Sequence, residues 1–176
     1  LAKPFPLKVV GDASYATLYL PYDVTTTGTT KAYYITTVNN GYAQLTATDN
    51  EGTEVPAFTA VVLVNSGADD STILNMTTEL SPVVSENKNL LKGTLVPMSL
   101  DLSDASSYYS LGKKEGIIGF YKFNNGETTT ITLGANKAYL DTGAIGGAVK
   151  GFTFSFDDET GISGISEISE NFKTIY

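Results

Sequence analysis

The residues of this sequence best suited to chemistry are tyrosines, because they occur in pairs and at strand spacing. The candidates for ligand binding are Tyr15, Tyr19, Tyr108 and Tyr109. Sugars stack on flat aromatic faces, and polar groups beside the rings fix their orientation. On a strand that rises about 3.3 Å per residue, Tyr15 and Tyr19 would share one face about 13 Å apart. One interpretation is a carbohydrate-binding surface; the favoured interpretation is that these rings cover the core edge or pair across strands.

Acidic residues form the second group of candidates. Asp157, Asp158 and Glu159 are consecutive and carry carboxylate oxygens, which are the ligands that Ca²⁺ prefers. The three residues do not follow the spaced loop of an EF-hand, so an ordinary acidic turn is the alternative. We therefore expect no cofactor, with a structural calcium ion at these residues as the exception.

The residue types that are missing exclude several kinds of chemistry. The chain has 176 residues with no Cys, His or Trp, and all eleven basic side chains are Lys. Without His or Cys there is no catalytic triad, no thiolate nucleophile and no soft-metal site. A carboxylate pair for glycoside hydrolysis would have to come from acids that stand mostly in turn-like segments. We expect a protein that is not an enzyme, and the lack of Trp also weighs against sugar binding.

The charge balance restricts the partners of the protein. Nineteen acidic residues against eleven lysines give a net charge of −8. Nucleic-acid binding needs clustered Lys and Arg, an anionic membrane surface would repel the chain, and no apolar run approaches the about 18 residues of a membrane span. The expected partners are other domains of the same polypeptide, surface proteins or glycans.

Alternation with a period of two, which is typical of strands, runs through the chain, and helical periodicity is nearly absent. Phe152, Phe154 and Phe156, for example, alternate with Thr153 and Ser155. The alternation predicts an all-β fold, an antiparallel sandwich in the jelly-roll or immunoglobulin-like range with about nine to eleven strands. The expected strands cover residues 5–10, 14–22, 31–39, 42–49, 58–65, 71–77, 91–96, 117–124, 127–133, 137–142 and 149–157. Segment 98–111 is ambiguous between a short helical turn and a strand with a long loop.

Two Asn-Gly pairs, at 40–41 and 125–126, stand between strand-like flanks and predict type I′ hairpin turns. A similar phrase follows each turn, at 56–62 and at 134–140. This repeat suggests two pseudo-equivalent halves near 1–80 and 81–160, and chance recurrence of turn residues is the alternative. After residue 160 the sequence becomes rich in Ser and Gly, so we expect a β-sandwich domain over 1–160 and a tail or linker over 161–176.

An ordered series of phrases resembles a known module. The phrases are residues 15–22, 31–33, 56–63, 89–94, 119–123, 133–140, 152–158 and 160–162. The series is similar to a module near the C-terminus of secreted and cell-surface Bacteroidetes proteins, where it follows leucine-rich repeats or hydrolases and precedes a sorting-type tail. The resemblance implies an all-β extracellular module and supplies no catalytic residues.

Taken together, these features predict a non-catalytic structural or interaction module of an exported cell-surface protein. Its location would be extracellular or at the cell surface, with the periplasm as the alternative. The export signal is not expected within this chain. Two other functions stay open: a carbohydrate-binding module that uses exposed Tyr, and an adhesin or fimbrial-type subunit that joins partners by strand addition.

Overall fold

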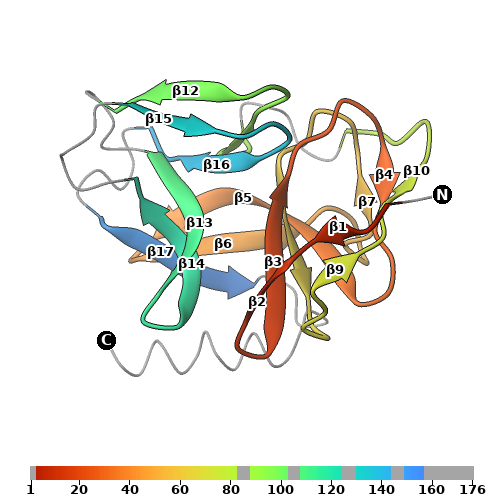
Figure 1. Cartoon of the computed structure of the whole chain (residues 1–176), viewed down its shortest axis with the longest axis horizontal. Coiled ribbons are helices and arrows are strands. Elements are labelled where there is room, and N and C mark those ends of the chain that lie inside the picture. The colour runs from red at the N-terminus through yellow and green to blue at the C-terminus, as the bar shows by residue number, and fades with distance from the viewer. Residues whose placement is uncertain (1–2, 83–87, 103–107, 124–129, 144–148, 157–176) are drawn as a thin grey trace.

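The computed structural model describes residues 3–82, 88–102, 108–123, 130–143 and 149–156 of the chain (Figure 1). These residues form seventeen strands and no helix, and 56% of them lie in strands. The predicted all-β class is therefore confirmed. The tail predicted over 161–176, the Asn125–Gly126 turn and the domain boundary near residue 160 lie outside the described residues, so they stay predictions.

The strands are β1 (Phe5–Pro6), β2 (Lys8–Val10), β3 (Ala13–Leu18), β4 (Val24–Thr25), β5 (Thr30–Asn39), β6 (Tyr42–Ala47), β7 (Glu54–Val55), β8 (Val61–Asn65), β9 (Ser71–Thr72), β10 (Asn75–Met76), β11 (Leu91–Gly93), β12 (Met98–Asp101), β13 (Tyr108–Lys114), β14 (Ile117–Lys122), β15 (Thr130–Leu133), β16 (Ala138–Asp141) and β17 (Gly151–Phe156). The ambiguous segment 98–111 thus contributes β12 and the start of β13, so its described residues, 98–102 and 108–111, contain strand and no helix.

One large sheet dominates the fold. Its ten strands follow the order β11-β16-β13-β14-β17-β6-β5-β8-β3-β2, and the sheet curls into a half-barrel. Three small sheets accompany it: β1-β9, β10-β4-β7 and β12-β15. Figure 1 shows β12 and β15 beside β16 at the upper left, while the other two small sheets gather on the right. The arrangement is sandwich-like, with a strongly curved main layer.

The main hydrophobic core fills the concave side of the large sheet. Period-two alternation directs one side chain in two toward this side, so every strand contributes to a single cluster. The fully buried members with the largest side chains are Tyr33, Ile35, Leu45, Tyr109, Phe120, Leu140, Phe152 and Phe154.

A second core lies on the opposite face of β3, β5 and β8. Here Leu18, Ala32 and Leu63 pack against Val24 of β4 and Val55 of β7. All six residues of β3 are therefore buried. Strands β3 and β8 are thus buried on both faces, because the small sheet β10-β4-β7 covers their second face.

The two halves of the chain follow one strand plan. Strands β3 to β8 give the order β6-β5-β8-β3 in the large sheet, and β11 to β16 give the order β14-β13-β16-β11. In each half the remaining two strands pair with each other outside that sheet, β4 with β7 and β12 with β15. The same six-strand arrangement therefore occurs twice.

The equivalent strands β8 and β16 are followed by the same kind of side-chain turn. After β8 the backbone N–H of Gly67 donates to Asn65 Oδ1 at 2.9 Å, and after β16 the N–H of Gly143 donates to Asp141 Oδ1 at 3.0 Å. Both are side-chain turns in which an Asn or Asp replaces a backbone acceptor. The last strand of each half thus ends in a turn held by an Asn or Asp side chain.

Strand β17 joins the two halves. It pairs antiparallel with β14 and parallel with β6, the equivalent strand of the other half. Since β6 and β14 run in opposite directions on either side of it, β17 has to be parallel to one of them. This position explains the one departure from the antiparallel pairing that the sequence predicts.

Candidate functional site

Two of the four predicted ligand-binding tyrosines lie in the main core. Tyr15 is 2% exposed and Tyr109 is fully buried. The Tyr109 hydroxyl donates to the carbonyl of Val149 at 2.7 Å, and burial raises its pKa. Burial, with a smaller contribution from Asp12, raises the pKa of Tyr15 to about 12. The prediction that these two rings offer an exposed stacking face is therefore wrong, because the curled sheet closes over them.

The other two predicted tyrosines are half-buried and have separate neighbours. Tyr19 makes an edge-to-face contact with Phe58 at a centroid distance of 6.3 Å, and Tyr108 makes one with Tyr139 at 5.8 Å. The ring of Tyr19 also covers Gly93, where an added Cβ would lie 1.9 Å from Tyr19 Cγ. These contacts fit the other interpretation of the sequence, in which the rings cover the core edge or pair across strands.

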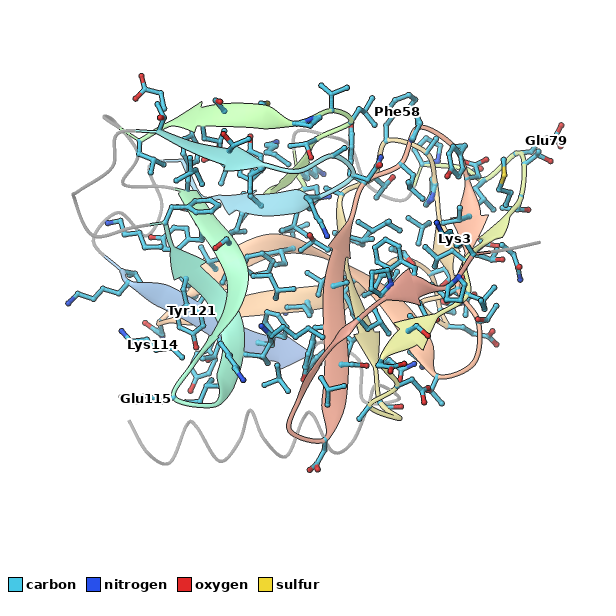
Figure 2. All side chains as sticks on the ribbon, in the orientation of Figure 1. Lys3, Phe58, Glu79, Lys114, Glu115 and Tyr121 are labelled. Atoms are coloured by element: carbon cyan, nitrogen blue, oxygen red, sulfur yellow. The ribbon has the colours of Figure 1, made fainter. Side chains whose placement is uncertain are left out.

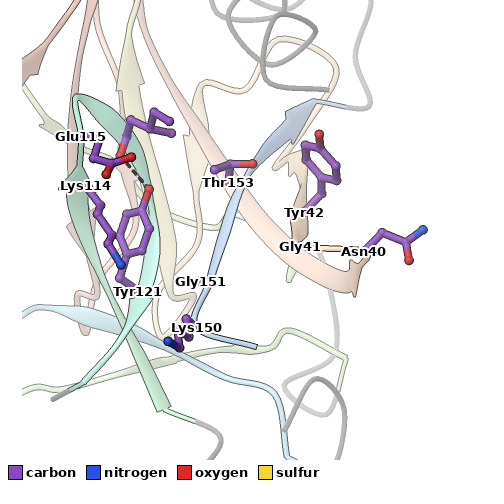
Figure 3. A pocket seen from close by; sticks show the side chains of 10 residues that line it. Asn40, Gly41, Tyr42, Lys114, Glu115, Tyr121, Lys150, Gly151 and Thr153 are labelled. Atoms are coloured by element: carbon purple, nitrogen blue, oxygen red, sulfur yellow. Dashed lines mark hydrogen bonds between the residues drawn. The ribbon is translucent and has the colours of Figure 1, made fainter. Parts of the chain in front are cut away.

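A hollow on the convex side of the large sheet is a better candidate site (Figure 3). It lies over β14, β17 and β6 and has a volume of about 460 Å³. The described residues that line it are Asn40, Gly41, Tyr42, Lys114, Glu115, Ile117, Tyr121, Lys150, Gly151 and Thr153. We call this hollow the outer groove.

The alternation of side chains along β17 determines which of its residues form the floor of the outer groove. Phe152 and Phe154 point into the core, so Gly151 and Thr153 between and beside them face outward. Thr153 is opposite Tyr42 of β6 on one side and Gly119 of β14 on the other. The centre of the floor therefore carries only small side chains.

Gly151 in the floor and Gly119 on the neighbouring strand β14 have no room for a larger residue. A Cβ on Gly151 would lie 2.5 Å from Cδ1 of Tyr121, and a Cβ on Gly119 would lie 2.5 Å from the carbonyl oxygen of Phe152. The Tyr121 ring consequently lies close against the backbone of β17. Its hydroxyl donates to the carbonyl of Ile117 at 2.8 Å, which fixes the ring at the side of the groove.

Tyr42 and Tyr121 stand on opposite sides of the groove. Figure 3 shows the two rings on either side of β17, with Thr153 between them. They belong to strands two places apart in the sheet, which separates their backbones by about 10 Å. Both side chains are half-buried and line the groove.

Two hairpin turns form the rim. Asn40 and Gly41 have φ values of 51° and 80°, and Glu115 and Gly116 have values of 54° and 79°. Both pairs match the type I′ geometry, in which both central residues have positive φ. The first turn is the Asn-Gly hairpin predicted from the sequence. Figure 2 shows the second, with Lys114, Glu115 and Tyr121 on one hairpin.

Sequence reasoning missed Tyr42 and Tyr121. Tyr42 follows the Asn40–Gly41 turn directly, and Tyr121 is two residues after Gly119 on the same face of β14. The available signal was the alternation within residues 119–121 and 151–154. In both segments, Phe positions that point inward alternate with positions that point outward, among them the Gly and Tyr positions. That signal becomes readable only when β14 and β17 are known to be neighbours.

The predicted calcium ligands Asp157, Asp158 and Glu159 lie outside the described residues, so that site stays a prediction. Within the described part of the chain, no group of three or more acidic residues is placed to hold a metal ion. The same residues contain no helix long and apolar enough to cross a membrane.

Comparison with known proteins gives no match: no family model, no curated protein and no solved structure is similar to this chain. The resemblance to a Bacteroidetes surface module therefore stays a prediction.

Proposed function

We propose that this chain is a non-catalytic carbohydrate-binding module and that the outer groove holds the sugar. The observation that carries the proposal is the pair of half-buried tyrosines, Tyr42 and Tyr121, on either side of a floor made of Gly and Thr. Sugars combine apolar C–H faces with hydroxyl edges, which suits aromatic walls beside polar groups.

The polar groups of the groove fit this use. Thr153 supplies a hydroxyl at the centre of the floor, and Asn40 supplies an exposed amide at the rim. Each can donate to and accept from a sugar hydroxyl. The rings would supply contact area and the polar groups orientation, which is the usual division of roles in a small-molecule site.

Binding is favoured over hydrolysis by the number of carboxylates. Cleavage of a glycosidic bond ordinarily needs two carboxyl groups about 5–10 Å apart. Glu115 is the one acid among the described residues that line the groove. We therefore propose a module that attaches the polypeptide carrying it to a glycan, in keeping with the exported surface protein expected from the sequence.

Affinity electrophoresis in gels that contain soluble polysaccharides tests the proposal. The protein should be retarded by at least one polymer, and Tyr42→Ala or Tyr121→Ala should weaken binding by about tenfold or more, as for central aromatic contacts. Tyr42→Phe keeps the ring and should retain most of the binding.

Tyr22→Ala is the matched control, because Tyr22 is 41% exposed and does not line the groove. It should bind as the unchanged protein does, and thermal melting should show that all variants are folded. If no polymer in a broad panel retards the protein, or if Tyr22→Ala weakens binding as much as Tyr42→Ala, the proposal fails.

Strand addition, the adhesin alternative, has less support. The edges of the large sheet are β2 and β11, each three residues long and each with a central or terminal Lys, at Lys92 and Lys8. Short edges that carry Lys discourage pairing with another chain.

A further inference from the structure

The outer groove carries two ammonium groups at one side. Lys114 ends β13, Lys150 precedes β17, and both line the groove with exposed side chains. Figure 3 places them on the same side of the groove as Tyr121, whereas Tyr42 stands on the other side. The strand register places the two lysines toward different ends of the groove. Lys114 is opposite Ile117 at the start of β14. The carbonyl of Lys150 accepts a hydrogen bond from the backbone N–H of Lys122, at the end of β14.

These lysines are notable because the protein is acidic. Acids outnumber lysines by nineteen to eleven, yet neither Lys114 nor Lys150 has a carboxylate partner among the residues that the structure describes. Glu115 also lines the groove and makes no ion pair there with a described lysine. Exposed ammonium groups attract the acidic groups of a ligand by charge.

We infer that the outer groove binds an anionic polysaccharide, whose acidic groups contact Lys114 toward one end of the groove and Lys150 toward the other. The inference rests on the proposed function and adds the class of ligand. A sugar ring placed between Tyr42 and Tyr121 over Thr153 would direct a substituent toward the Tyr121 side, where the lysines are. Ammonium groups act there as point charges with three donors each, which suits either a carboxylate or a sulfate ester.

The negative charge of Glu115 allows a further test of the inference. Its carboxylate lies in the same groove and repels an anionic ligand. Glu115→Gln should therefore strengthen binding, whereas a groove for neutral sugars would be little changed by it. Glutamine has the same length as glutamate, so the type I′ turn at Glu115 and Gly116 should keep its form.

Affinity electrophoresis with three polymers tests the inference: polygalacturonate, a sulfated galactan and a neutral galactan. The protein should be retarded by at least one anionic polymer and less by the neutral one. Lys150→Gln or Lys114→Gln should each weaken that binding about fivefold, the size of an exposed ion pair. At high salt the difference between anionic and neutral polymers should shrink, because screening shortens the range of charge interactions to about 3 Å at 1 M.

Lys113→Gln is the matched control, because Lys113 is exposed on the same strand but does not line the groove. It changes the net charge equally and should leave binding within twofold. Comparison of polygalacturonate with the sulfated polymer tells whether the acidic group is a carboxylate or a sulfate.

Three outcomes overturn the inference. Retardation by the neutral polymer that is equal to or stronger than by both anionic ones, and lost in Tyr42→Ala, rejects the anionic ligand and keeps the proposed sugar site. Equal losses in Lys113→Gln and Lys150→Gln reject the lysine pair as the site of the charge. No retardation by any polymer rejects the inference together with the proposed function.

Discussion

At the scale of single residues, burial separates the tyrosines that build the core from those that can meet a ligand. Tyr15 and Tyr42 both stand on strands and are both followed by Ala in the sequence, yet Tyr15 is 2% exposed and Tyr42 is half-buried on the convex side. The difference comes from the curl of the sheet, which encloses the concave face. A residue's own neighbours in the sequence do not specify on which face it lies.

The buried phenol of Tyr15 makes stability depend on alkaline pH. Its pKa is raised to about 12 in the folded protein, mainly by burial, whereas the unfolded chain has the ordinary value of about 10. The folded state therefore holds this proton more tightly, so stability from this group is complete below pH 10 and is lost as pH rises from 10 through 12. The loss should be on the order of 2–3 kcal/mol.

Tyr15→Phe checks this prediction, because it keeps the ring that contacts Phe154 and removes the ionisable hydroxyl. Denaturant melts at pH 9 and pH 12 should show a smaller fall in the free energy of unfolding for the variant. Tyr22→Phe, at an exposed position, should behave like the unchanged protein. An identical fall in the free energy of unfolding for Tyr15→Phe would contradict the raised pKa assigned to Tyr15.

Equivalent turns in the two halves have the same backbone conformation although their residue types differ. Phe58 before β8 has a φ of 57°, and Asn136 before β16 has a φ of 59°. Asn adopts positive φ readily and a bulky residue such as Phe rarely does. The backbone N–H of Phe58 donates to Leu20 at 2.8 Å, and that of Asn136 donates to Thr94 at 2.7 Å, so tertiary hydrogen bonds hold both turns.

At the scale of elements, β17 has the densest aromatic packing. The ring of Phe154 lies 5.8 Å from Tyr15, 5.9 Å from Phe120 and 6.3 Å from Phe156 between centroids. Phe154→Ala would leave a cavity at the junction of both halves and should lower the free energy of unfolding by about 3–5 kcal/mol. Denaturant melts measure this loss directly.

The control lies on the same strand. Ser155 is half-exposed and outside the main core, so Ser155→Ala should change stability by less than about 0.5 kcal/mol. Should Phe154→Ala melt within 1 kcal/mol of the unchanged protein, the inward face of β17 would be assigned wrongly.

Most of the long strands could be predicted from the sequence, because alternation and turn residues are local signals. The pattern of Phe152, Phe154 and Phe156 and the Asn40–Gly41 turn both led to the observed elements. Strands β4 and β7 were missed, because two residues are too short to show a period. The outer groove was missed for another reason: it needs the pairing of β17 with β14 and β6, which are contacts between residues far apart in the sequence.

At the scale of the whole molecule, the repeated strand plan and the shared core favour opposite modes of unfolding. Each half has its own set of strands, which would allow two units that unfold separately. The main core, however, is one cluster to which both halves contribute, and β17 hydrogen-bonds to a strand of each half. Packing across the junction should therefore couple the two halves.

This coupling predicts a single unfolding transition. Phe152 makes an edge-to-face contact with Tyr109 of the second half at 5.0 Å, and Phe156 makes the matching contact with Tyr33 of the first half at 5.1 Å. Phe152→Ala and Phe156→Ala should lower the Tm of one common transition, since each removes packing from the same cooperative unit. Calorimetry measures this as one peak whose calorimetric and van't Hoff enthalpies agree in all three proteins. Two separate peaks, one of them moved by Phe152→Ala and the other by Phe156→Ala, would show instead that the halves are independent and that β17 merely lies between them.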